Sequence, residues 1–94
     1  MMMMDDLHER IIKIMTDFEL LKQANELTQN EEWSEALKVF EKILKDDPLD
    51  AHIWFKIGEI HEELEHEKVA AMCYEKARSL GYETYEYQEY DLRN

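Results

Sequence analysis

The chain has 94 residues, a length that accommodates a single domain. Its 23 acidic and 11 basic residues leave a net charge of −12, which disfavours nucleic acid because Lys and Arg on phosphates supply most of that affinity. No run approaches the ~18 to 20 apolar residues of a membrane span, and the N-terminus lacks the pattern of a secretory signal. We therefore expect a cytoplasmic protein with no nucleic-acid and no membrane partner. Two glycines and one proline are too few for a many-stranded β fold, which indicates an all-α protein.

Residues 5–29 are predicted to form one long helix. The segment from Thr16 to Glu19 also resembles a capping box, which would start a new helix at Asp17. No residues remain there for a reversing turn, however, and the apolar spacing runs straight through. A continuous helix is therefore favoured. Its apolar residues recur at alternating spacings of four and three: Leu7, Ile11, Ile14, Phe18 and Leu21.

Three shorter amphipathic helices are predicted to follow. The second begins near Trp33 and ends at Asp46-Asp47-Pro48, because a residue before proline avoids helical geometry. The third is expected from about Ala51 to Leu64, and the fourth from about Glu67 to Leu80. Gly81 follows the fourth helix directly and suits a left-handed C-terminal cap.

The sequence matches itself at an offset of 34 residues. Small and large residues recur in pairs: Ala24 with Gly58, Ala36 with Ala70, Phe40 with Tyr74, and Leu20 with Trp54. Together with Ile57 and Pro48, this pattern resembles the tetratricopeptide repeat, although Gln23 and His61 depart from it. The resemblance implies an all-α fold of antiparallel helix hairpins, a two-repeat α-solenoid, acting as a protein-protein interaction adaptor. Independently of the resemblance, small residues would let paired helices approach and large ones would fill the space between hairpins.

The repeat pattern divides the single domain, residues 1–94, into four parts. Residues 5–16 form an N-terminal helical extension, residues 17–50 the first repeat, residues 51–82 the second, and residues 83–94 an acidic, tyrosine-rich tail. Two repeats are fewer than the ~3 that usually bury a continuous core, so the open ends are expected to need cover. The tail is interpreted as a C-terminal cap. Tyrosine phosphorylation, or insertion into the groove of another copy, is the alternative.

The resemblance also implies a peptide-binding groove. In the family, the first helix of each hairpin lines a concave surface that receives a peptide or a partner helix. The carboxylate clamp of the heat-shock co-chaperones is not reproduced, because Leu21 and Lys56 replace its lysine and its second asparagine. Glutamates in the groove favour a basic or amphipathic partner. Carried over to this sequence, the predicted groove holds Phe18, Leu21, Asn25, His52, Phe55, Lys56, Glu59 and Glu62.

The alternative function is a structural homodimer assembled through the long first helix. Leu7, Ile11, Ile14 and Phe18 form a seam wider than one short hairpin can cover. Pairs of identical chains commonly bury such a seam symmetrically. In this alternative the tail or a second copy would also cover Phe18, Leu21 and Phe55, leaving no separate groove.

No enzyme, cofactor or metal is predicted. The chain has no glycine-rich phosphate loop and no nucleophile elbow. His61 with Glu65, and Glu62 with His66, have the spacing of metal ligands, but the two pairs point to different faces of a helix. Cys73 is the only cysteine, which excludes an intrachain disulfide, and its place on an apolar helix side indicates a buried, unreactive thiol.

Overall fold

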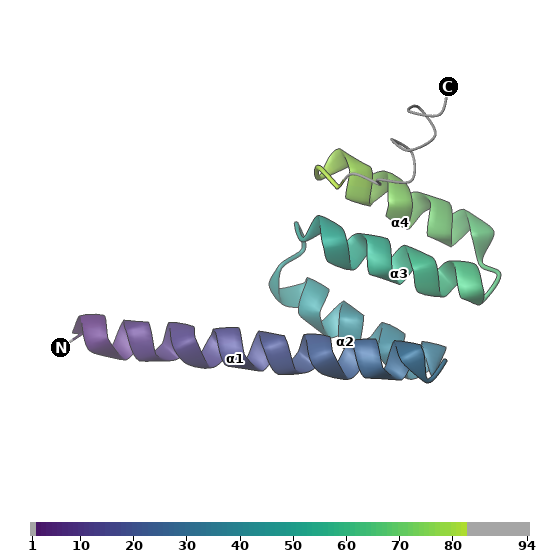
Figure 1. Ribbon diagram of the computed structural model, residues 1–94. Helices are drawn as coiled ribbons and strands as arrows, with labels where there is room; N and C mark the ends of the chain where they lie inside the picture. Colours follow the sequence, from purple (N-terminus) through teal and green to yellow (C-terminus); the bar gives the residue numbers. More distant parts are fainter. Residues whose placement is uncertain (1, 83–94) are drawn as a thin grey trace, which may run out of the picture.

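The structure is a computed structural model that describes the backbone of residues 2–82 and the side chains of residues 7–82. The chain forms α1 (Met2–Gln29), α2 (Trp33–Asp46), α3 (Ala51–Glu63) and α4 (Glu67–Ser79) (Figure 1). This all-α architecture confirms the predicted fold class, and each predicted helix end lies within three residues of the observed one. The tail of residues 83–94, with its proposed cap, lies outside the described residues.

The first helix runs without interruption through Thr16, as the unbroken apolar spacing predicted. Its two halves differ in their surroundings. The C-terminal half packs against α2, whereas the N-terminal half projects beyond the stack of the other three helices (Figure 1). The extension therefore does not fold back over either end of the stack.

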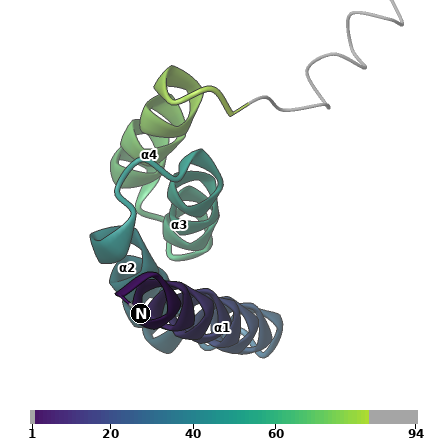
Figure 2. The same ribbon diagram turned by 90° about the vertical axis from the view of Figure 1, so that its left-hand side faces the viewer.

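The helices are arranged in two layers. Viewed along α1, α1 and α3 lie on one side of the molecule, and α2 and α4 lie on the other (Figure 2). The extensive helix contacts join α1 to α2, α2 to α3, and α3 to α4. This is the layering of stacked antiparallel hairpins, in which first helices share one surface.

Three helices end in the same hydrogen-bonded turn. The residue after each C-terminal cap adopts a positive φ, and its own amide and the next one donate to carbonyls of the last turn in the Schellman pattern. In the first turn, the Glu32 amide donates to the Leu27 carbonyl at 2.9 Å and the Glu31 amide donates to the Thr28 carbonyl at 3.0 Å. The left-handed residues are Glu31 (φ 60°), Glu65 (φ 63°) and Gly81 (φ 103°). Gly81 thus confirms the predicted cap, and the two glutamates take up a conformation that glycine adopts with less strain.

The connection between the repeats is held by two side chains. The Asp50 carboxylate accepts a hydrogen bond from the Ile53 amide at 3.2 Å and so caps the N-terminus of α3. The indole nitrogen of Trp54 donates to the carbonyl of Pro48 at 2.8 Å. Both hydrogen bonds hold the α2–α3 connection, which begins where α2 ends before Pro48. They therefore help to position α3 against the first repeat.

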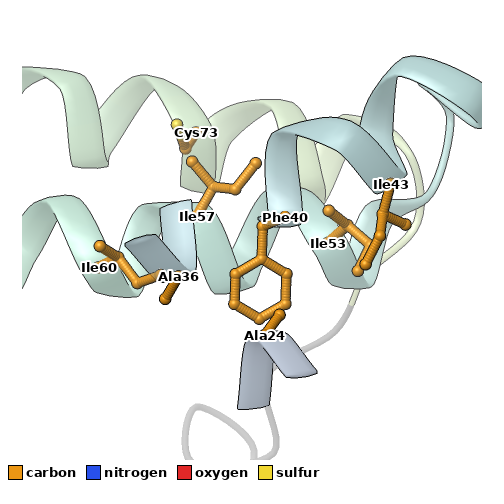
Figure 3. Packing of buried hydrophobic residues seen from close by; sticks show 8 residues of the cluster. All are labelled: Ala24, Ala36, Phe40, Ile43, Ile53, Ile57, Ile60 and Cys73. Atoms are coloured by element: carbon orange, nitrogen blue, oxygen red, sulfur yellow. The ribbon is translucent and has the colours of Figure 1, made fainter. Parts of the chain in front are cut away.

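The core runs along the middle of the stack. Phe40 and Ile60 are the largest fully buried side chains, and Figure 3 shows the Phe40 ring among residues of α1 and α3. Burying such a side chain contributes about 1.5–3 kcal/mol relative to leaving it exposed. The small residues predicted at helix contacts are buried, with Ala24 and Ala36 fully so. The buried cluster consists of Ala24, Ala36, Phe40, Ile43, Ile53, Ile57, Ile60 and Cys73.

Candidate interaction surface

A small hollow opens where α1 leaves the helix stack. Its volume is about 170 Å³, enough for one long side chain, and its lining comes from α1, the end of α2 and the start of α3. We call it the acidic hollow. Its apolar lining is Phe18, Leu21, Ile43 and Ile53, and its acidic lining is Asp17, Asp46, Asp47 and Asp50.

A lysine of the same chain already binds this acidic rim. The Lys13 ammonium lies 3.3 Å from a carboxylate oxygen of Asp17 and 3.7 Å from one of Asp46. The hydrogen bond to Asp17, followed by the attraction of both carboxylates, raises the pKa of Lys13. All three side chains remain substantially exposed, so each pair is screened by solvent and can exchange.

Two of the three predicted groove residues on α1 are exposed and one is partly buried. Phe18 is 65% exposed although it is aromatic, and it borders the acidic hollow. Leu21 is partly buried against the core, and Asn25 is exposed. Phe18 is therefore the large apolar side chain of this set that is open to a partner.

The α3 half of the predicted groove is partly covered by aromatic rings. The ring of Phe55 stacks on Tyr82 with centroids 4.5 Å apart and lies 5.1 Å from Tyr74. His52 also approaches Tyr82, at 5.9 Å. Phe55 is thus half-buried beneath Tyr82 and does not stand free.

The charged residues of the α3 half form contacts within the chain. The Lys56 ammonium pairs with Glu59 at 3.6 Å, and the Glu62 carboxylate accepts a hydrogen bond from the Tyr74 hydroxyl at 2.6 Å. Burial, together with this carboxylate, raises the pKa of Tyr74 well above its ordinary range. None of His52, Phe55, Lys56, Glu59 and Glu62 lines the acidic hollow, which reaches α3 through Ile53.

The two histidines at the α3–α4 turn approach each other. Their Nδ1 atoms are 3.2 Å apart, and desolvation, followed by the neighbouring His66, lowers the pKa of His61. Within residues 7–82, no group of three or more His, Cys, Asp or Glu side chains is arranged to hold a metal ion. Cys73 is buried, and this burial raises the pKa of its thiol, which fits an unreactive packing role.

Residues 18–60 match the family model described as tetratricopeptide repeat. Over these residues the chain is similar to the tetratricopeptide repeat family, which supports the resemblance seen in the sequence. The match covers α2 and most of α3, with the C-terminal half of α1, and α4 completes the second repeat by its 34-residue correspondence with α2. Tetratricopeptide repeats generally mediate protein-protein interaction and typically have no enzymatic activity. No curated protein and no solved structure was found that matches the chain.

The predicted dimer seam is exposed along its length. Leu7 is 57% exposed, Ile11 49%, Ile14 66% and Phe18 65%, and every residue from 7 to 16 is exposed. Ile12 and Met15, which the seam prediction did not include, add to the same exposed apolar segment. Among the described residues, no helix combines the length and the hydropathy needed to cross a membrane.

Sequence reasoning missed the aspartates of the hollow and the aromatic cover of Phe55. The run Asp46-Asp47-Pro48 predicts a helix end, but residues 46–50 also contain three aspartates, and in the structure these form an anionic rim beside Phe18. Tyr82 occupies the position where the first repeat has Pro48, 34 residues earlier. The replacement of proline by tyrosine is the sequence signal from which an aromatic side chain at the end of the second repeat could have been predicted.

Proposed function

We propose that the protein is an interaction adaptor that binds a basic or amphipathic peptide segment along α1 and α3, with the acidic hollow as the anchor point. The observation that carries the proposal is the combination of an apolar floor and four aspartates in one hollow. An apolar floor alone would accept any aliphatic side chain. The aspartates select a side chain with an apolar stem and a cationic end, which describes lysine and arginine.

Lys13 supports this choice of ligand. Its ammonium lies between Asp17 and Asp46, as a partner's cation would. Because both pairs are exposed, a peptide cation can replace Lys13 at little cost. The net charge of −12 further favours the encounter with a basic partner.

The remaining predicted groove residues would contact the rest of the peptide. Asn25 offers an amide to a peptide backbone, while Glu59 and Glu62 extend the negative charge along α3. Phe55 would meet the ligand together with Tyr82, which stacks on it. On this proposal His52 and Lys56 contribute at the groove edge rather than at the anchor.

The test is a binding selection followed by two charge-removing variants. A displayed library of random peptides should yield ligands enriched in Lys or Arg next to apolar residues, and their affinity is then measured by fluorescence anisotropy. Asp46→Asn with Asp47→Asn should weaken binding by up to about fivefold for each aspartate, since an exposed ion pair contributes about 0.2–1 kcal/mol.

The matched control removes the same charge at the other end of α2. Glu31→Gln with Glu32→Gln lies in the α1–α2 turn, away from the acidic hollow, and should leave the affinity within about twofold. Lys13→Ala removes the competing cation and should tighten binding. Selection of acidic peptides, or equal losses in both double variants, would contradict the proposed anchor.

A further inference from the structure

We propose that residues 7–18 of α1 pair in an antiparallel arrangement with the same residues of a second copy of the chain. This surface meets the peptide anchor at Asp17 and Phe18, which also line the acidic hollow, whereas Leu7, Ile11 and Ile14 lie outside it. The seam Leu7, Ile11, Ile14 and Phe18 is exposed, and its spacings of four, three and four residues follow the alternation of a heptad, in which one four and one three average 3.5 residues. A repeat of 3.5 keeps an apolar seam facing a partner helix along its whole length.

The occupant must come from outside the helices of this chain that the structure describes. The extension is continuous with the rest of α1, so it cannot fold back, and α2, α3 and α4 stack beside the C-terminal half (Figure 1). A helical segment of this length is marginal in water without tertiary packing. An ion pair from Lys13 to Asp46 links the extension to α2 and leaves the seam residues uncovered.

Symmetry makes a second copy a matching occupant. The midpoint of the seam falls between Ile11 and Ile14, so a two-fold axis there sets Ile11 of one copy against Ile14 of the other. The same axis sets Leu7 against Phe18 at both ends. Each large apolar residue thereby meets a large apolar residue, and both seams are covered by a single closed interface.

Charge favours the antiparallel direction. Arg10 and Asp17 directly precede the seam residues Ile11 and Phe18, so they occupy the same flank of the helix one heptad apart. In an antiparallel pair this flank of one copy faces the same flank of the other copy. Arg10 of each copy then lies near Asp17 of the other, which gives two symmetry-related charge pairs. A parallel pair would instead bring Arg10 beside Met15. It would also set the two helix stacks, both strongly acidic, side by side at one end.

The first test is sedimentation equilibrium of the full chain from low to high micromolar concentration. The wild type should sediment at twice the chain mass of 11.4 kDa. Ile11→Asp with Ile14→Asp should raise the dissociation constant by more than about tenfold, because each buried charge would lack a partner. Neither residue lines the acidic hollow, so peptide binding should persist in this variant.

The matched control places two charges on other exposed apolar residues. Leu49 is 68% exposed and Met72 is 70% exposed, both outside the seam, so Leu49→Asp with Met72→Asp should remain a dimer. A wild type that stays monomeric would overturn the proposal and leave the seam to the tail of the same chain or to another protein. A dimer that survives the Ile11 and Ile14 substitutions would overturn it as well.

Thiol cross-linking tests the direction. Leu7→Cys and Phe18→Cys are each prepared in a Cys73→Ala background and treated with a short bis-maleimide. An equimolar mixture should cross-link, whereas each variant alone should not, because the antiparallel register holds two copies of residue 7 about 16 Å apart along the axis. Efficient cross-linking of the Leu7→Cys variant with itself would overturn the antiparallel arrangement.

Discussion

The two repeats place equivalent residues in different surroundings. Phe40 in α2 is fully buried, whereas Tyr74, 34 residues later in α4, is half-buried and its hydroxyl donates to Glu62. The cause is position in the stack, because α2 lies between α1 and α3 while α4 has the described chain on one side only. The interior helix α2 therefore accommodates the apolar ring of Phe40. The terminal helix α4 accommodates Tyr74, whose hydroxyl lies outside the core.

The small residues show the same difference. Ala24 in α1 is fully buried in the core cluster, and repeat 2 has Gly58 in its place. A Cβ atom added at Gly58 would lie 2.8 Å from the Tyr74 ring and 3.2 Å from the Cys73 Cβ. The Tyr74 ring thus occupies space that a methyl group on the facing helix would fill.

The largest expected effect comes from a charge at either helix contact. Ala36→Asp and Ala70→Asp each place an unpaired carboxylate where two helices touch, since Ala36 is 0% and Ala70 is 3% exposed. The cost is several kcal/mol against a total stability of about 5–15 kcal/mol, so both variants should lose cooperative melting by circular dichroism. Ala71→Asp, at the exposed neighbouring position, should melt like the wild type. Full helicity and a cooperative melt in both buried variants would be incompatible with the repeat packing.

Gly58→Ala should be the next most damaging change. The added methyl group meets the Tyr74 ring, and overpacking of this kind costs about 1–3 kcal/mol, against the ~1 kcal/mol gained by replacing glycine in a helix, so we expect a net loss of up to ~2 kcal/mol. Chemical denaturation measures the loss. In the background of Tyr74→Leu, Gly58→Ala should become neutral or stabilising. An unchanged cost in that background would show that the ring is not the obstacle.

Glycine at the two left-handed glutamates should stabilise the protein. Glu31→Gly and Glu65→Gly each relieve a positive φ in a turn that both repeats share, and each should raise the free energy of unfolding by about 0.5–1 kcal/mol. Gly81→Ala introduces a side chain at a positive φ in the same kind of turn, so it should lower the free energy of unfolding by a similar amount. Because the same turn occurs in both repeats, the two glutamate variants should gain similar amounts of unfolding free energy. A gain in one variant alone would show that the two turns are not energetically equivalent.

The smallest expected effect is a pH dependence confined to repeat 2. His61 stands where repeat 1 has Leu27, and its pKa is lowered by desolvation and by His66, against the weaker opposing attraction of Glu41. A lowered pKa means that the unfolded chain binds more protons, so stability is full above the ordinary imidazole value of about 6.5 and falls as pH drops below it. The melting temperature should decrease slightly from pH 7.5 to pH 5.5. His61→Leu should flatten this slope, and an unchanged slope would place its origin elsewhere.

The fold was predictable because its signals are local and repeated. Pro48 ends α2, Gly81 ends α4, and small residues recur at the same offset as large ones, so the helices and their pairing follow from neighbours in the sequence. The left-handed turns at Glu31 and Glu65 carry no such signal, because glutamate rarely marks this conformation.

The candidate site was only partly predictable. Phe18 was identified from its helix position, but the acidic hollow depends on where the connection after α2 brings Asp46 and Asp50 in space. Likewise, Phe55 was expected on the groove surface. Its cover by Tyr82 follows from the path of the chain after Gly81, which residue spacing does not determine.

The serial contacts between helices have a consequence for amide hydrogen exchange. Each helix is protected chiefly by the helix before it and the helix after it, so the stack can open from either end without opening its middle. Phe40 and Ile60 lie in α2 and α3, and amides there should exchange last. The amides of residues 7–16 have solvent around them in a single chain. Their exchange should therefore slow as the protein concentration rises, while exchange in α2 and α3 stays the same.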